Sequence, residues 1–218
     1  MILIGMTWHS TPDLVPKGAP RFYKQDFLVD IRYPFIEKQI GNYVNFIYIS
    51  GENNKIVPIL SGNEVAITGQ DHEYIKGFDS FAGMAVAVQY ALSNGMDYLY
   101  MEHDCLAVGL DKILDWASGK DICYGFGKYG FAPDWAEHSL VYISNSFMPE
   151  FLSQMNSTQI VGVPGIVPEI IFHRMFGDAA DAWPFGYGRK RPINYKDEMF
   201  YAQQLNNAET NNILQEVI

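Results

Sequence analysis

The stretch FAGMAVAVQYALSNGMDYLYMEHD, residues 81–104, predicts a helix that is followed by a buried strand. Apolar residues recur at helical spacing in its first half and form one stripe: Phe81, Met84, Val88 and Leu92. Gly95 stands where a left-handed residue commonly ends a helix. The continuous apolar run Tyr98–Met101 is typical of a strand buried on both faces, and it ends abruptly at Glu102-His103-Asp104.

Strand and helix patterns alternate along the rest of the chain as well. The expected strands are Ile2–Thr7, Val44–Ile49, Glu64–Thr68, Asp121–Tyr124 and Ser139–Ile143. The expected helices are 34–41, Leu110–Ala117, Pro168–Phe176 and Asp197–Leu205, whereas the proline-rich residues 8–26 are expected to form a long loop. This alternation predicts an α/β fold with a mixed, mainly parallel central sheet covered on both faces. Ligands of such sheets bind at the carboxyl ends of the strands.

Composition excludes several classes of protein. A length of 218 residues fits one domain, and 48% hydrophobic residues suffice for a packed core. The net charge of −10 would repel the phosphates of nucleic acid. Cys105 and Cys123 form neither a disulfide framework nor a zinc motif, so we expect a reducing, cytoplasmic location. The sequence has no apolar run of the length that spans a membrane.

The triplet Glu102-His103-Asp104 is the most charged of the segments that follow the expected strands. Two carboxylates held together at a strand end repel each other unless a cation lies between them. Hard divalent ions such as Mg²⁺ or Mn²⁺ bind protein carboxylates and fill their other positions with phosphate and water. In the alternative interpretation, Glu102 only caps the next helix and Asp104 is only solvated.

An acid-x-acid triplet after a glycine-started helix and the approach Gly95-Met96-Asp97-Tyr98 resembles the glycosyltransferases of the GT-A fold, the nucleotide-diphospho-sugar type. The resemblance implies a hexosyltransferase that moves a sugar from a UDP- or GDP-linked donor to a hydroxyl of a carbohydrate or other acceptor. It implies Mn²⁺ or Mg²⁺ on Glu102 and Asp104. The family usually has Asp at the first position, so Asp104 carries over more directly than Glu102.

Other segments resemble the same family in the same order. Thr7 and Trp8 end the first strand where these enzymes begin their nucleotide pocket, so they are the expected donor-binding residues. Residues 138–143 resemble the strand under the acceptor site, and residues 188–204 resemble a closing segment of some bacterial members. The resemblance implies one domain over 1–218, with a nucleotide-sugar half at 1–109 and an acceptor-side half at 110–218.

Three of the fifteen cationic residues lie together in Arg189-Lys190-Arg191. Arginine forks match phosphate oxygens, so Arg189 and Arg191 are candidates to bind the donor's diphosphate. The alternative is a solvated turn whose charge balances Asp197 and Glu198.

Glu169 is the candidate catalytic base. Inverting enzymes of the GT-A type use a carboxylate from the second half of the chain to deprotonate the acceptor hydroxyl, and Glu169 has the corresponding position. An acid in the first turn of a helix is also favoured electrostatically without any catalytic role. His173 lies on the same helical face, and we expect an ordinary histidine there rather than a metal ligand.

Two other functions remain open. The principal alternative is a non-catalytic nucleotide-sugar or carbohydrate-binding module on the same fold. A less favoured one is an NAD(P)-dependent oxidoreductase, because residues 125–130 fit the pattern G-x-G-x-x-G. That fingerprint needs a helix at its last glycine, whereas Pro133 follows here. Four loop aromatics are candidates to stack on sugars: Trp135, Trp183, Phe185 and Tyr187.

Overall fold

The computed structural model describes residues 1–8, 28–49, 62, 64–69, 78–127, 135–157 and 168–217. Its strands are β1 (Ile2–Trp8), β2 (Tyr43–Ile49), β3 (Glu64–Thr68), β4 (Asp97–Met101), β5 (Cys105–Val108), β6 (Ile122–Gly125), β7 (Glu137–Ile143), β8 (Ala180–Ala182) and β9 (Phe200–Gln203). Its helices are α1 (Tyr33–Glu37), α2 (Phe78–Ser93), α3 (Leu110–Ala117), α4 (Met148–Ser157), α5 (Pro168–Phe176) and α6 (Asn207–Val217). A short π-helix, Leu28–Arg32, leads directly into α1.

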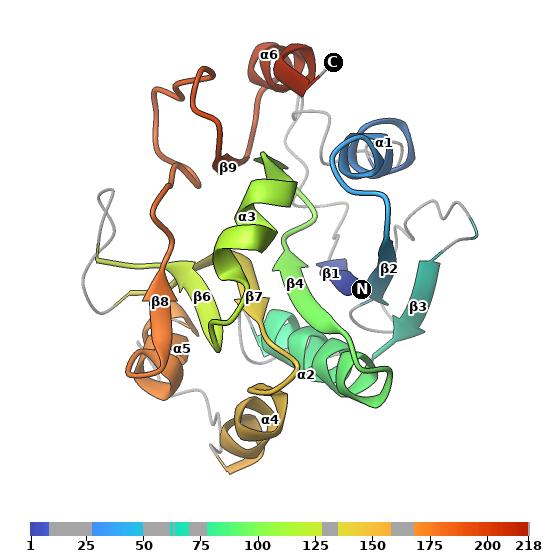
Figure 1. The fold of residues 1–218 in the computed structure, drawn as a ribbon, viewed down its shortest axis with the longest axis vertical. Helices are drawn as coiled ribbons and strands as arrows, with labels where there is room; N and C mark the ends of the chain where they lie inside the picture. Colours follow the sequence, from blue (N-terminus) through green and yellow to red (C-terminus); the bar gives the residue numbers. More distant parts are fainter. Residues whose placement is uncertain are drawn as a thin grey trace.

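Seven strands form the central sheet in the order β3-β2-β1-β4-β7-β6-β8 (Figure 1). Strands β1 to β4 are mutually parallel, whereas β7 runs antiparallel to both of its neighbours, β4 and β6. The pairing of β6 with β8 is again parallel. The expected α/β fold with a mixed, mainly parallel sheet is therefore confirmed. Strands from 1–109 and from 110–218 share this sheet, and the proposed division into two functional halves stays a prediction.

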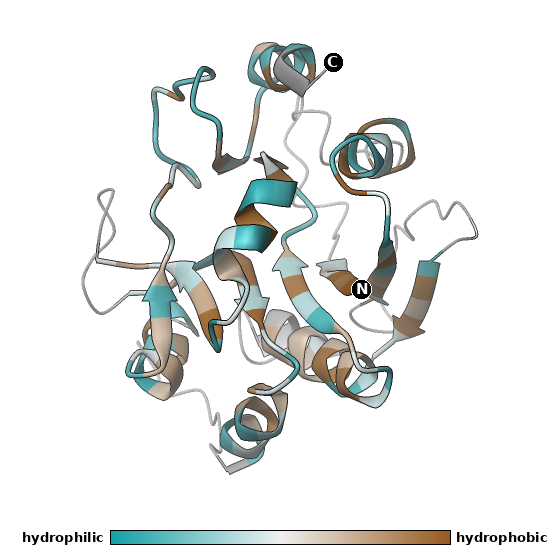
Figure 2. Ribbon diagram, viewed as in Figure 1, coloured by the Kyte–Doolittle hydropathy of each residue, from teal (hydrophilic) through white to brown (hydrophobic). Residues whose placement is uncertain are grey.

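Helices cover the sheet on both sides, which explains why its inner strands β1, β4, β7 and β6 are largely buried. On one side α2, α4 and α5 pack together through aromatic side chains that include Phe81, Phe151 and Phe172. On the other side Ile36 of α1 and Ile113 of α3 lie in a second core (Figure 1). Figure 2 shows the hydrophilic outward face of α3 above this core. Among the helices of the described residues, none combines the length and apolarity needed to cross a membrane.

Helix α2 packs very closely on β1. A Cβ atom at Gly83 would overlap the hydroxyl of Thr7, so only glycine allows this approach. The helix ends as predicted, with Gly95 in the left-handed region at φ 63°. Strand β4, which precedes the acidic triplet, pairs with β1 and has a fixed position beside it.

One predicted helix is wrong. Residues 197–205 do not form a helix, because Phe200–Gln203 is strand β9, which pairs antiparallel with β5 in a separate two-stranded sheet. Phe200 and Ala202 pack in one core cluster and Tyr201 in another, so successive side chains alternate between two faces as in a strand. This pairing brings residue 203 to residue 105, directly after the acidic triplet.

Candidate functional site

The acidic triplet forms a tight turn between β4 and β5. The backbone N–H of Cys105 donates to the carbonyl oxygen of Glu102 at 3.0 Å and closes the turn. The N–H of Glu102 donates to the carbonyl oxygen of Ser139 on β7, also at 3.0 Å. Asp104 is only 8% exposed, and Cys105 is fully buried beneath the turn.

A polar network on β7 and β9 surrounds the Glu102 carboxylate. With the Gln203 amide oriented to satisfy its neighbours, its nitrogen donates to Glu102 Oε2 and its oxygen accepts from Arg189 Nε at 2.8 Å. Ser139 Oγ lies 2.7 Å from the same amide nitrogen and donates to the carboxylate of Glu137. Through Gln203, the structure connects the predicted acid Glu102 with the predicted cation Arg189.

Glu102 is strongly perturbed by this environment. Burial and the charges of Asp104 and Glu137 together raise the pKa of Glu102 to about 8, against the opposing charge of Arg189. Glu137 is a third acid that the sequence analysis did not identify. Carboxylate oxygens are the donors that Mg²⁺ and Mn²⁺ prefer, and Mg²⁺ is usually held by one or two carboxylates with substrate phosphates.

Glu102 and Asp104 therefore fit such an ion. Among the described residues, no three or more His, Cys, Asp or Glu side chains come together as a metal-binding group. Two carboxylates would hold the ion only together with oxygen ligands from a substrate or from water.

His138 lies between the acidic turn and helix α5. Its Nε2 is 3.6 Å from Glu102 Oε1, and its ring packs against Phe81 with the centroids 6.0 Å apart. Burial lowers the pKa of His138, and the charges of Glu169 and Glu137 act in the opposite direction. The backbone of Glu169 also accepts a hydrogen bond from Ala136 N at 3.2 Å. The first turn of α5 is thus attached to the start of β7.

Thr7 and Trp8, the expected donor-binding residues, are buried at the end of β1. The Trp8 ring contacts His103 of the triplet edge-on, with the centroids 5.5 Å apart. Thr7 Oγ1 is buried and has no hydrogen-bond partner among the described residues. The structure therefore places Trp8 beside the acidic turn.

Arg191 has different neighbours from Arg189. Its guanidinium binds the Glu209 carboxylate of α6 through Nε and Nη2. It also donates to the backbone carbonyls of Gly188 at 3.2 Å, Lys190 at 3.0 Å and Gln203 at 3.0 Å. These contacts hold the basic loop against β9 and α6. The donor-binding role of Arg191 stays a prediction.

Two of the loop aromatics proposed to stack on sugars are buried. Trp183 is 1% exposed and donates from Nε1 to the carbonyl of Leu140 at 2.9 Å, and it stacks on Phe185. That expectation is wrong for these two residues, because they fill the core beside β7. Trp135 is 40% exposed, and Tyr187 donates to the carboxylate of Asp197.

His173 is held by a hydrogen bond within the fold, since its Nδ1 lies 2.9 Å from the hydroxyl of Tyr124. The dinucleotide fingerprint at 125–130 also lacks its structural context. Strands β6 and β7 on either side of it pair antiparallel, whereas the fingerprint belongs to a parallel βαβ unit. Residues 128–134, which include the end of this motif, lie outside the described residues.

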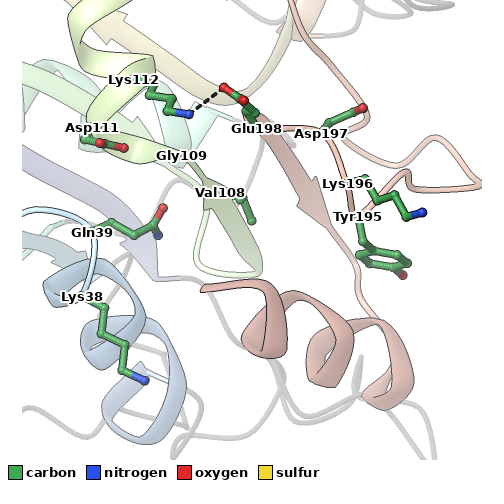
Figure 3. A pocket seen from close by; sticks show the side chains of 10 residues that line it. All are labelled: Lys38, Gln39, Val108, Gly109, Asp111, Lys112, Tyr195, Lys196, Asp197 and Glu198. Carbon is green, nitrogen blue, oxygen red and sulfur yellow. Dashed lines mark hydrogen bonds and ion pairs between the residues drawn. The ribbon is translucent and has the colours of Figure 1, made fainter. Parts of the chain in front are cut away.

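A polar pocket of about 400 Å³ opens at the far end of β5 (Figure 3). The end of α1, the β5–α3 junction and the loop 195–198 line it. Lys112 and Glu198 pair across it at 2.6 Å. Gly109 adopts φ 70°, and a Cβ there would overlap the carbonyl oxygen of Glu198, which makes glycine necessary. The pocket contains none of the predicted site residues.

A solved structure shares this fold. It is the crystal structure of a glycosyltransferase involved in the glycosylation of the major capsid of PBCV-1. The TM-score is 0.54 at 10% sequence identity, and the match covers 99% of this chain and 98% of that chain. A scan of protein-family models gives no match, and neither does a search of curated proteins. The chain therefore has the fold seen in a glycosyltransferase, over almost the whole length of both chains.

Proposed function

We propose that this protein is a glycosyltransferase that moves a sugar from a nucleotide-diphosphate donor, UDP- or GDP-linked, to an acceptor hydroxyl. One observation carries the proposal: Gln203 joins the acid Glu102 and the cation Arg189 at the carboxyl end of β4. Open parallel sheets bind ligands at this edge. The fold shared with a known glycosyltransferase supports the same reaction class.

In this proposal, Glu102 and Asp104 hold Mn²⁺ or Mg²⁺. The ion, when bound, neutralises the negative charge of the diphosphate leaving group. Arg189 pairs with the phosphate oxygens, since a guanidinium presents a fork of donors that matches them. Arg191 supports Arg189 by holding the loop to Glu209.

The acceptor hydroxyl must lose a proton as it attacks the sugar carbon. In an inverting reaction Glu169 takes that proton. The position of Glu169 supports this role, since its helix lies beside His138 and the acidic turn. Thr7 and Trp8 border the nucleotide at the end of β1, where Trp8 lies beside His103 of the acidic turn.

A non-catalytic nucleotide-sugar or carbohydrate-binding module on the same fold is the second candidate. The first acid of the triplet favours it, because Glu102 stands where the resembled family usually has Asp. Turnover separates the two candidates, since only an enzyme releases free nucleotide from the donor.

The test is a panel of UDP- and GDP-sugars, with and without Mn²⁺, measured by thermal shift and then by nucleotide release. A ligand that binds the folded state raises the melting temperature by mass action. We expect a metal-dependent shift with one nucleotide class and slow release of the free nucleotide. A shift without any release, in the presence of candidate acceptors, would favour the binding module. No shift with any donor would contradict both the glycosyltransferase and the nucleotide-sugar-binding module.

A further inference from the structure

Arg32 is a buried cation directly beneath the acidic turn. It is the last residue of the π-helix Leu28–Arg32, immediately before α1, and only 1% of it is exposed. Its guanidinium donates to three backbone carbonyls of the turn: Met101 at 2.8 Å, Glu102 at 2.7 Å and Cys105 at 3.2 Å. These carbonyls belong to the residue before the triplet, to its first residue and to the residue after it, so one side chain fixes the whole turn.

The burial of this charge needs compensation. A buried ion that lacks a partner is costly, and no carboxylate lies within ion-pair distance of Arg32 among the described residues. Three hydrogen bonds from a charged donor and the negative charge of nearby Asp104 offset part of that cost. A short π-helix is rare in proteins and is frequently found at functional sites.

We infer that Arg32 is a positioning residue for the candidate active site: it holds the carbonyls of the 101–105 turn inward, which turns the carboxylates of Glu102 and Asp104 toward the ligand. The effect on ligand binding rests on the proposed function. The effect on the order of the turn does not.

Gln39 supplies a matched control from the same part of the fold. Its side chain also binds backbone groups near β5, because Nε2 donates to Ala107 O at 3.0 Å and Oε1 accepts from Leu110 N at 3.0 Å. These bonds lie at the opposite end of β5 from the triplet. Gln39→Met therefore removes a comparable clamp without touching the acidic turn.

The experiment compares Arg32→Met, Arg32→Lys and Gln39→Met with the wild type. The first readout is the rate at which a thiol reagent labels Cys105, quantified by mass spectrometry against Cys123, which is also buried. The second readout is the affinity for UDP and GDP with Mn²⁺. Removal of hydrogen bonds from a charged donor changes an equilibrium by about tenfold to hundredfold.

We expect Arg32→Met to label Cys105 at least about tenfold faster relative to Cys123, and to bind the nucleotide about tenfold to hundredfold more weakly. Arg32→Lys keeps the charge but loses the forked guanidinium. Its labelling rate and its nucleotide affinity should therefore lie between those of Arg32→Met and the wild type. Gln39→Met should match the wild type in both readouts. If Arg32→Met does not fold, Arg32→Lys decides by the same two measurements.

The two hypotheses fail separately. Labelling of Cys105 at the wild-type rate in a folded Arg32 variant would overturn the positioning role. A wild-type protein that binds neither UDP nor GDP with Mn²⁺ would overturn the proposed function, whereas the labelling result would still report on the turn.

Discussion

The Nε2 atom of His138 lies 3.6 Å from Oε1 of Glu102, and burial favours the uncharged form of both groups. The pKa of Glu102 is raised to about 8, whereas that of His138 is lowered. Near neutral pH the pair is therefore a carboxylic acid beside a neutral imidazole and not an ion pair. A cation bound at the turn would favour the carboxylate again.

The first prediction concerns the dependence of stability on pH. The folded state holds the Glu102 proton up to a pKa of about 8, whereas the unfolded chain releases it at about 4.5. The folded state thus binds more protons between these values, so the contribution of Glu102 to stability falls as the pH rises through this window. His138 acts oppositely: its lowered pKa makes stability rise with pH up to about 6.5.

Glu102→Gln should remove this fall in stability with rising pH and leave the contribution of His138 unchanged. Urea unfolding at several pH values, without divalent ions, measures the free energy of unfolding of the wild type and of the variant. The free energy of unfolding should decline less for the variant than for the wild type between about pH 6.5 and about pH 8. Parallel curves over that range would show that Glu102 titrates normally in the folded protein.

The second prediction concerns the metal. Asp104→Asn removes one carboxylate from the acidic turn, so Mn²⁺-dependent binding of a nucleotide diphosphate should be lost while the fold is retained. Calorimetry with and without Mn²⁺ measures this loss. Asp111→Asn, an exposed acid on α3, is the charge-matched control and should bind as the wild type does. Unchanged metal dependence in Asp104→Asn would place the metal elsewhere.

The third prediction separates two neighbouring arginines. Arg189→Ala should weaken binding of the diphosphate more than binding of the bare nucleoside, because Arg189 Nε lies beside Gln203 and the acidic turn. Arg191→Ala removes the same charge but also the contacts with Glu209, so it should mainly lower the melting temperature. Calorimetry and thermal unfolding of both variants provide the comparison. Equal losses of diphosphate affinity would indicate that Arg191 also contacts the donor directly.

The fourth prediction concerns the base. Glu169→Gln should keep the donor affinity within a small factor and reduce the rate of sugar transfer about 10²–10⁴-fold, the usual effect of a positioned base. Glu150→Gln on α4, which changes an exposed acid in the same way, should transfer at the wild-type rate. Near wild-type transfer by Glu169→Gln would indicate another base or a retaining reaction, which the anomeric configuration of the product would distinguish.

Local patterns predicted most of the central sheet. The apolar runs of β1, β2 and β4 and the helical stripe of α2 each need only neighbouring residues in the sequence. Gly95 ended its helix as expected, since it adopts a positive φ. The acidic triplet could also be located, because a change from apolar to charged residues marks the end of a buried strand.

The surroundings of the triplet could not be predicted. Arg32, Gln203 and Glu137 come from three distant segments, and their roles depend on pairings such as β5 with β9 that leave no local signal. In Phe200–Gln203 the side chains on both faces are apolar or buried, so the period of two was hidden. Tertiary contacts decided the conformation there.

The pairing of β5 with β9 affects how the protein is made. A ribosome that adds about 5–20 residues per second releases Gln203 some 5 to 20 s after Cys105. During that interval β5 has an unpaired edge, and the acid Glu102 lacks the amide that later covers it. The nascent chain therefore passes through a stage in which the surroundings of the acidic turn are incomplete and the edge of β5 is open to other chains. Slow translation of the last residues would prolong that exposure.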